Sequence, residues 1–367
     1  MTDSNEICVA ILTDLGTDHR CFKLVSSLKE MGYSPIIYCD KPRNALSPGW
    51  QNFKIVTLTK TSHYDGFGKA FLPFLLKLTK AVLTSKSRTW LVLDCPPLFW
   101  VAFLGKIRSL KIIYDSHEIF LETPLVKSRA SRKLFWSFWH NAGMALIDKM
   151  IVVSPLCEQY FKELYPSKKI FLLPNAPPKK DFAVFSKPPP GKNTNLIFQG
   201  GLRVATGLEE TMDALKSLPH FNLQIFGFGP EETSLKLRMQ SLKLESQVTF
   251  HGAIPFNELV PHMELADIGI HLMQPICKSF ALTLANKLFD YVHALTPVLL
   301  SDNPAHREFL LKHPVGIVVD SYSPEAIKNG LEKLKLNLEF HQQACLKARE
   351  EWHWNKFAQK LPAFLLS

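Results

Sequence analysis

The chain has 367 residues, of which 46% are hydrophobic and 21% charged. That composition is typical of a globular protein with room for two domains. The seven cysteines form neither a CxxC pair nor a metal-ligand cluster, so we expect free thiols in a reducing cytosol and no bound metal. No stretch has the roughly 18 uncharged apolar residues of a membrane-spanning helix, and the acidic N-terminus does not resemble a signal peptide.

The net charge of +10 lies in the first half of the chain. Residues 1–180 hold 25 Lys and Arg against 14 Asp and Glu, whereas residues 181–367 hold 18 against 19. A basic half-protein indicates an anionic partner. No nucleic-acid-binding motif is present, so we expect a membrane surface and no nucleic acid.

Along the first half, short apolar runs alternate with helical or loop segments. The first run feeds a helix at 20–31 through the turn at Gly16. Alternation of this kind predicts an α/β fold with a parallel sheet. The predicted strands are residues 7–12, 34–39, 90–93, 111–114, 150–153 and 170–173.

A Pro- and Lys-rich stretch at 177–193 predicts a linker, after which the alternation restarts. The pattern indicates a second α/β domain and a ligand cleft between the domains. The predicted strands of this half are residues 196–199, 223–226, 248–250, 268–272, 297–300 and 316–319.

One polar cluster, Tyr114-Asp115-Ser116-His117-Glu118, ends a predicted strand of the first domain. Ligands bind at the carboxyl ends of strands in such sheets, so we favour a functional role over a structural one. His117 and Glu118 are the candidate catalytic residues, because either can exchange protons or orient a hydroxyl.

Two glycine loops follow strands of the second domain. Gly200 and Gly201 let backbone amides approach a phosphate, which Arg203 would hold. Gly227 and Gly229 follow the next strand, and a tight turn before a helix explains them equally well.

The segment 283–309 predicts a helix, a buried strand and a second helix. Lys287 and Asp290 share one face of the first helix, within its first turns. A diphosphate at the helix start, with Lys287 beside it and Asp290 on ribose hydroxyls, fits this arrangement. A surface Lys–Asp pair is the alternative.

In order along the chain, YDSHE, LLPNAP, FQGGL, FGFGPEE, VTFHGAIPFNEL, ADIGI and NKLFDYVHALTPVLLSDNPAHREF resemble the motifs of retaining family-4 glycosyltransferases. The resemblance covers nearly the whole chain and is strongest over 196–310. It implies the GT-B architecture of two Rossmann-like, doubly wound domains. The implied domains are 1–180 for the acceptor, 181–345 for the nucleotide sugar, and a helix at 346–367 crossing back to the first domain.

The resemblance also implies transfer of a hexosyl or N-acetylhexosaminyl group from a UDP-, GDP- or similar sugar, without metal or cofactor. The acceptor would be a lipid-linked or envelope glycan. Asp290 matches the ribose-binding carboxylate, and the amides around Thr283 and Leu284 match the pyrophosphate-binding helix start. Gly16 matches a turn that approaches the donor phosphates, and His117 matches a histidine near the transferred sugar.

Other activities on the same fold remain open. Leu282 and Thr206 stand where the family carries an acid and a phosphate-binding base, which favours a degenerate protein that binds a nucleotide sugar without turnover. An epimerase or a phosphorylase is a further alternative.

Basic, aromatic helices of the first half predict contact with the cytoplasmic face of an anionic membrane. Packing of these helices on the sheet is the alternative. The candidate contacts within 127–140 are Arg129, Arg132, Lys133, Trp136 and Trp139.

Overall fold

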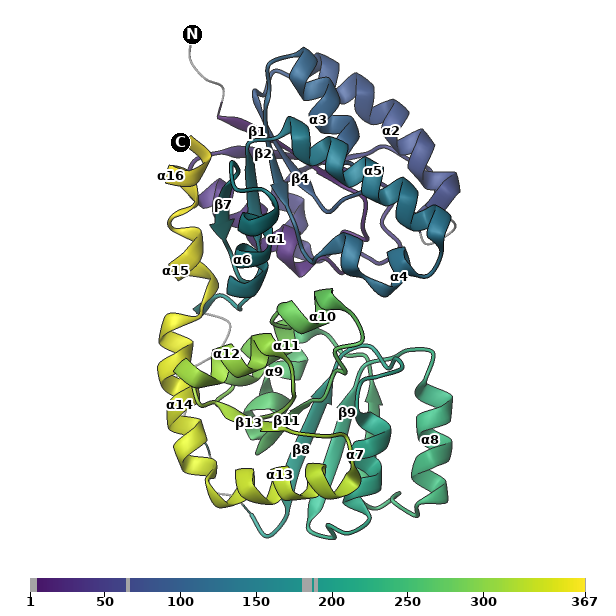
Figure 1. Cartoon of the computed structure of the whole chain (residues 1–367), viewed down its shortest axis with the longest axis vertical. Helices are drawn as coiled ribbons and strands as arrows, with labels where there is room; N and C mark the ends of the chain where they lie inside the picture. Colours follow the sequence, from purple (N-terminus) through teal and green to yellow (C-terminus); the bar gives the residue numbers. More distant parts are fainter. Residues whose placement is uncertain (1–4, 64–66, 180–186, 188–190, 367) are drawn as a thin grey trace. The chain divides into compact units, whose positions relative to one another are not determined.

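The structure, a computed structural model, describes residues 5–63, 67–179, 187 and 191–366. The chain divides into two compact units (Figure 1). The N-terminal unit comprises Met1–Leu173 with Ala358–Ser367, and the C-terminal unit comprises Pro174–Phe357. Most of the linker expected at 177–193 lies outside the described residues.

The N-terminal unit is built on a parallel sheet of seven described strands in the order β3-β2-β1-β4-β5-β6-β7. Six of them confirm the predicted strands to within two residues, whereas the four-residue β3 was not predicted. Its sequence KIVT is too short to show a period. The strands are β1 (Glu6–Ile11), β2 (Ser34–Cys39), β3 (Lys54–Thr57), β4 (Thr89–Leu93), β5 (Lys111–Asp115), β6 (Lys149–Val152) and β7 (Lys169–Leu172).

Side chains cap the first turns of two helices of this unit, α1 and α6. Asp18 accepts a hydrogen bond from the backbone N–H of Cys21 (2.7 Å) at the start of α1. Helices α2, α3 and α5 pack side by side (Figure 1). The helices are α1 (His19–Glu30), α2 (Phe67–Thr84), α3 (Leu98–Ile107), α4 (Pro124–Lys127), α5 (Ala130–Leu146) and α6 (Pro155–Leu164), with 3₁₀ turns at Pro48–Asn52 and Phe120–Glu122.

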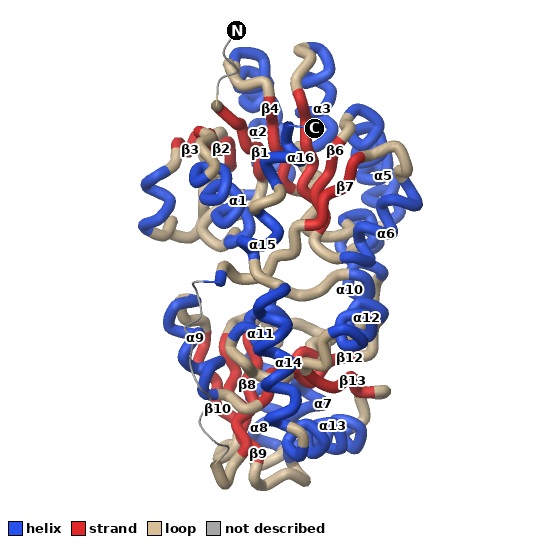
Figure 2. Tube along the Cα trace, turned by 90° about the vertical axis from the view of Figure 1, so that its left-hand side faces the viewer, coloured by secondary structure: helices blue, strands red, loops and turns tan. Residues whose placement is uncertain are grey.

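The C-terminal unit has a second parallel sheet, of six described strands in the order β10-β9-β8-β11-β12-β13 (Figure 2). All six match predicted strands. Near-continuous apolar sequence buries β8, β11 and β12 on both faces, whereas the edge strand β10 is partly exposed. The six strands are β8 (Thr194–Gln199), β9 (Phe221–Phe226), β10 (Val248–Gly252), β11 (Ile268–His271), β12 (Val298–Ser301) and β13 (Gly316–Val319).

Helices connect these strands in the right order for a doubly wound sheet. They are α7 (Leu208–Leu215), α8 (Glu232–Ser241), α9 (Phe256–Leu265), α10 (Lys278–Leu282), α11 (Asn286–His293), α12 (Pro304–Lys312), α13 (Pro324–Leu336) and α14 (Leu338–Glu351). Helix α11 begins at Asn286, so Thr283 and Leu284 lie in the loop before it rather than in its first turn.

The chain end is not one helix over 346–367, as expected, but α14 followed by the short helices α15 (Trp354–Ala358) and α16 (Leu361–Leu366). Pro362 lies in the first turn of α16, a position that suits its missing N–H and ends any continuous helix. Helix α16 belongs to the N-terminal unit, where Lys149 Nζ donates to the Phe364 carbonyl (2.7 Å). None of the described helices has the length and apolar content needed to cross a bilayer.

Candidate functional site

Strands β1, β4 and β5 are neighbours in the N-terminal sheet, and each has an aspartate at or just beyond its carboxyl end. Because parallel strands end at the same edge, Asp14, Asp94 and Asp115 lie along one edge of the sheet. Sequence reasoning included only Asp115, as part of the cluster that contains His117. The signal for the other two was available, since Asp94 directly follows a predicted strand and Asp14 lies two residues after one.

Asp115 is fixed by an arginine that the sequence did not single out. Arg20, on α1, donates from Nη2 to Asp115 Oδ1 (2.7 Å) and from Nε to Oδ2 (3.0 Å). Its Nη1 donates to the Leu173 carbonyl (2.9 Å). Burial raises the pKa of the Asp115 carboxyl, but the charges of Arg20 and His117 outweigh it and lower the pKa to about 2.

His117 lies between two carboxylates. Its Nδ1 is 3.3 Å from Asp94 Oδ2, and its Nε2 is 3.4 Å from Asp115 Oδ2. Burial alone would lower the pKa of His117, but Asp94 and Asp115 raise it well above the ordinary value. Asp94 is held there with a left-handed backbone (φ 62°). The geometry therefore favours an imidazolium that supplies positive charge over a neutral histidine that accepts a proton.

Glu118, the second catalytic candidate, is half-buried beside this group. Its backbone carbonyl accepts a hydrogen bond from Ser116 Oγ (2.7 Å), which fixes the turn after β5. The strand end thus holds His117 and Glu118 in one rigid turn.

Gly16 lies in the turn after β1, against the loop at Asn44. A Cβ on Gly16 would stand 2.7 Å from the Asn44 carbonyl oxygen, so a glycine is needed for this close approach. Asp14 ties the two loops together, accepting from the Gly16 N–H (3.1 Å) and from Asn44 Nδ2 (2.6 Å).

In the C-terminal unit the two glycine loops press against each other. A Cβ on Gly227 would stand 1.8 Å from the Gly200 carbonyl oxygen, and one on Gly229 would stand 2.1 Å from the Leu202 carbonyl oxygen. Gly200 and Gly227 also have positive φ (127° and 139°). Packing between loops therefore requires both Gly227 and Gly229, whether or not a ligand lies nearby.

Lys287, in the first turn of α11, reaches the loop of Gly200. Its Nζ lies 4.2 Å from the centre of the Phe198 ring. A Cβ added to Gly200 would stand 2.9 Å from the same Nζ atom. Burial lowers the pKa of the Lys287 ammonium to about 8, with Asp290 opposing the shift and Arg203 adding to it. The cation is thus held on the strand end of β8 rather than extended into solvent.

Asp290 lies one turn further along α11 and also points to the end of β8. Its Oδ2 accepts from Gln199 Nε2 (2.9 Å). The adjacent Tyr291 is buried, and its hydroxyl accepts from the Gln199 N–H (3.0 Å) and donates to the Ile197 carbonyl (3.2 Å). Gln199 and Tyr291, which sequence reasoning missed, therefore fix α11 and its carboxylate on the strand.

The remaining donor-site candidates lie around this group. Arg203 is exposed, and its side chain lies beside Gly201. Thr283 donates from Oγ1 to the Ser279 carbonyl (2.7 Å) and so closes α10. Leu284 is buried, so only its backbone is available for a ligand.

One part of the membrane-contact prediction is wrong. Trp136 and Trp139 are only 6% and 8% exposed, because both rings pack against Phe71 of α2. Trp139 Nε1 donates to the Pro96 carbonyl (3.0 Å), and the Trp136 ring packs edge-on against Phe120. Arg129 and Lys133 are exposed and Arg132 is half-buried.

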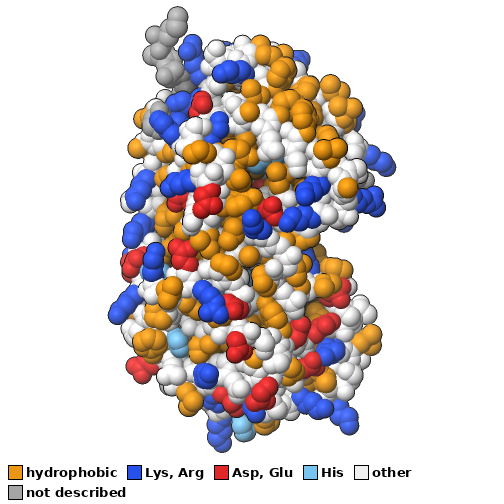
Figure 3. Space-filling view, viewed as in Figure 1, with side chains coloured by type: hydrophobic (Ala, Val, Ile, Leu, Met, Phe, Trp, Pro, Cys, Tyr) orange, Lys and Arg blue, Asp and Glu red, His pale blue; other side chains and the backbone are white. Residues whose placement is uncertain are grey.

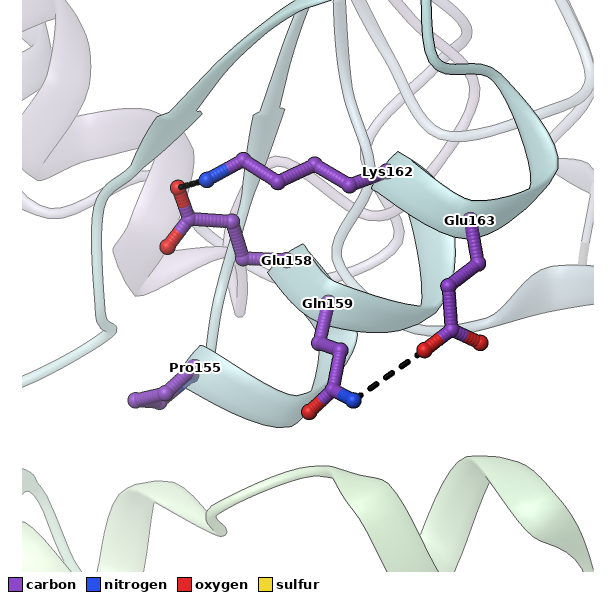
Figure 4. A pocket seen from close by; sticks show the side chains of 5 residues that line it. All are labelled: Pro155, Glu158, Gln159, Lys162 and Glu163. Carbon is purple, nitrogen blue, oxygen red and sulfur yellow. Dashed lines mark hydrogen bonds and ion pairs between the residues drawn. The ribbon is translucent and has the colours of Figure 1, made fainter.

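A pocket on α6 is separate from all of these residues. Pro155, Glu158, Gln159, Lys162 and Glu163 line it (Figure 4). Lys162 pairs with Glu158 (2.7 Å) and Gln159 donates to Glu163 (3.0 Å), one helical turn apart in each case. These are ordinary surface contacts of a helix, and they indicate no chemistry.

Comparison with known proteins matches most of the second unit to a family. Residues 179–351 match the family described as "Glycosyl transferases group 1". This region resembles a group 1 glycosyltransferase domain. The match covers the segment that contains Gly200, Lys287 and Asp290. No curated protein gives a significant match to the chain.

Solved structures resemble the whole chain. Sucrose-phosphate synthase from Thermosynechococcus elongatus has a TM-score of 0.77 at 15% identity, covering 98% of each chain. Anabaena HepE, solved with UDP and glucose, has a TM-score of 0.76 at 14% identity, covering 98% of this chain and 99% of its own. WaaG, a glycosyltransferase involved in lipopolysaccharide biosynthesis, has a TM-score of 0.71 at 14% identity, again covering 98% of this chain and 99% of its own. The fold is therefore GT-B, with two Rossmann-like domains.

Proposed function

We propose that the protein transfers a hexosyl or N-acetylhexosaminyl group from a nucleotide sugar to an envelope glycan or lipid-linked acceptor. The proposal includes retention of the anomeric configuration, independence of metal, and work at the cytoplasmic face of a membrane. The observation that carries it is the placement of Lys287 and Asp290, on the first turns of α11, against the end of β8.

Lys287 would contribute to leaving-group departure. Cleavage of the anomeric bond leaves negative charge on a diphosphate, and fixed cations or amides aimed at that charge lower the barrier. The first turn of α11 offers a cation, Lys287, and free backbone amides at the same helix end. In the proposal Gly200 leaves room for the ammonium, and Arg203 adds a second cation from the loop.

Asp290 would bind the ribose hydroxyls. A carboxylate accepts two hydroxyl hydrogen bonds well only if it is held in place, and Gln199 supplies that support. In the N-terminal unit, His117 would contribute positive charge or donate a hydrogen bond to the sugar.

The experiment that tests donor binding is a thermal-shift titration with UDP, GDP, ADP, CMP and dTDP. UDP comes first, because HepE has been solved with UDP and with UDP-glucose. Asp290→Asn should weaken binding of the best nucleotide by about tenfold or more. Asp320→Asn is the control, an exposed aspartate of the same unit. Equal affinity in both variants would remove Asp290 from the donor site.

A degenerate protein remains the second candidate, favoured by one observation. Leu282 ends α10, where the glycosyltransferase pattern has an acid eight residues before the ribose carboxylate. Incubation with the matching nucleotide sugar separates the cases. Transfer or slow hydrolysis excludes the degenerate protein, an isomerised sugar supports an epimerase, and binding without turnover supports degeneracy.

A further inference from the structure

Helices α2, α3 and α5 expose apolar side chains that the sheet does not use. Two such residues one turn apart occur on each helix: Leu72 and Leu76, Phe103 and Ile107, Leu134 and Phe138. Their exposed fractions run from 44% to 75%. We call these six residues, with Leu83 and Phe135, the outer apolar face.

The three helices are in contact, so their exposed stripes are neighbours. Trp100 Nε1 on α3 donates to Thr79 Oγ1 on α2 (2.8 Å). On the other side of α3, the Phe99 ring packs edge-on against Phe138 of α5 at 6.1 Å. Figure 3 shows hydrophobic side chains gathered over the region where Figure 1 places these helices. A continuous apolar patch on three adjacent helices marks an interaction surface.

The charge of this face has one sign. The sequences of α2, α3 and α5 contain no Asp or Glu. These helices therefore offer their lysines no carboxylate partner. The exposed lysines on the three helices are Lys69, Lys77, Lys80, Lys106 and Lys133. By contrast, α6 pairs its Lys162 with Glu158. An apolar face whose three helices carry lysines and no acidic residue is complementary to an apolar layer under a negative surface.

We propose that the outer apolar face docks on an anionic lipid bilayer. The leucine, isoleucine and phenylalanine side chains enter the boundary between headgroups and acyl chains, and the lysines lie against lipid phosphates. This inference deepens the membrane placement in the proposed function and rests on it, but it does not depend on sugar transfer. A second copy of the chain fits poorly, because a two-fold interface would bring the same cations face to face.

The test is co-sedimentation of the full chain with vesicles of phosphatidylcholine alone or mixed with phosphatidylglycerol. We expect binding to the mixed vesicles, little binding to phosphatidylcholine, and weakening as salt rises. Leu76→Glu, Ile107→Glu and Phe138→Glu should each reduce binding. All three side chains are more than 60% exposed, so the fold should survive. Leu336→Glu, at a site 83% exposed in the C-terminal unit, is the matched control.

A second pair of variants tests the charge. Lys77→Ala and Lys80→Ala should each weaken binding to mixed vesicles by roughly fivefold. Binding that is equal on both vesicle types, or equal in Leu336→Glu and the three face variants, would overturn the proposal. So would self-association in solution that the face variants abolish, since the face would then join protein to protein.

The same preparations are titrated with UDP and the other nucleotides. If the natural chain binds a nucleotide but no vesicles, the result counts against docking alone. If the natural chain binds mixed vesicles but no nucleotide, the result counts against sugar transfer alone.

Discussion

Arg20 and Asp115 form a two-point ion pair that is closed to solvent, with oxygen–nitrogen distances of 2.7 and 3.0 Å. Their side chains are 3% and 0% exposed. The pair joins α1 to the end of β5, immediately before His117. The candidate catalytic turn is therefore held by a contact between segments far apart in the sequence.

Removing one partner of the Arg20–Asp115 pair should lower the stability of the fold. Arg20→Leu leaves the Asp115 carboxylate buried without its main counter-charge, and we expect a loss of about 3–5 kcal/mol of unfolding free energy. Denaturant unfolding of the N-terminal unit measures it. Lys162→Met, which breaks an exposed pair on α6, should change little. Similar small effects of both changes would contradict the structural role of the pair.

Acid should weaken the same contact. The pKa of Asp115 is lowered to about 2 in the fold, against roughly 4 when unfolded. Its contribution to stability is thus complete above about pH 4 and is lost as the pH falls through about 2. Unfolding measured over this range should show a steeper loss in the natural chain than in Arg20→Leu. If stability fell with pH equally in both proteins, Arg20 would not be the cause of the lowered pKa of Asp115.

His117 should remain charged at neutral pH. Its pKa is raised above the ordinary 6.5, so the stability from its charged form is complete below pH 6.5 and is lost as the pH rises through the folded pKa. Histidine-ring NMR should show a doubly protonated ring at pH 7.5. Asp94→Asn should lower that pKa by removing one carboxylate. His306, whose pKa burial lowers to about 4, is the internal neutral control, and a neutral His117 would contradict the prediction.

Nucleotide diphosphate binding should depend on the charge of Lys287. Because burial lowers its pKa to about 8, affinity should fall as the pH rises through 8, where the ammonium loses its proton. The stability of the free protein should change in the other direction, rising between about pH 8 and 10.5. Titration at pH 7 and 9 measures the affinity. Lys287→Arg keeps a fixed charge and should remove most of the pH dependence, whereas an unchanged profile would exclude Lys287.

Gly227 should tolerate no side chain. Its Cβ would stand 1.8 Å from the Gly200 carbonyl oxygen, so Gly227→Ala must separate the two loops, at a cost of about 4 kcal/mol or more. Gly252→Ala is the matched control in the same unit, with positive φ and open space around it. It should cost only the left-handed backbone term, about 1–2 kcal/mol. Thermal unfolding compares the stabilities of the two variants. Equal losses of stability would show that the two loops can move apart at little cost.

The two sheets could be read from the chain because buried parallel strands are short apolar runs separated by helical segments. Strand β3 was missed because KIVT is too short to carry a period. Helical spacing located Lys287 and Asp290, because a separation of three residues on one helix is local information, and the strand-end rule located His117. Their supports, Gln199 and Tyr291, were missed because both contacts join residues about 90 positions apart.

The sequence by itself determined the two α/β units, the ordered glycosyltransferase motifs and the basic first half, because hydrophobic period, turn residues and charge are local properties. Only the tertiary structure decided which side chains of the basic helices face outward. It placed Trp136 and Trp139 inside and Leu134 and Phe138 outside. It also set His117 between Asp94 and Asp115. Burial and charge pairing depend on neighbours distant in the chain, and these decide whether a histidine is a base or a cation.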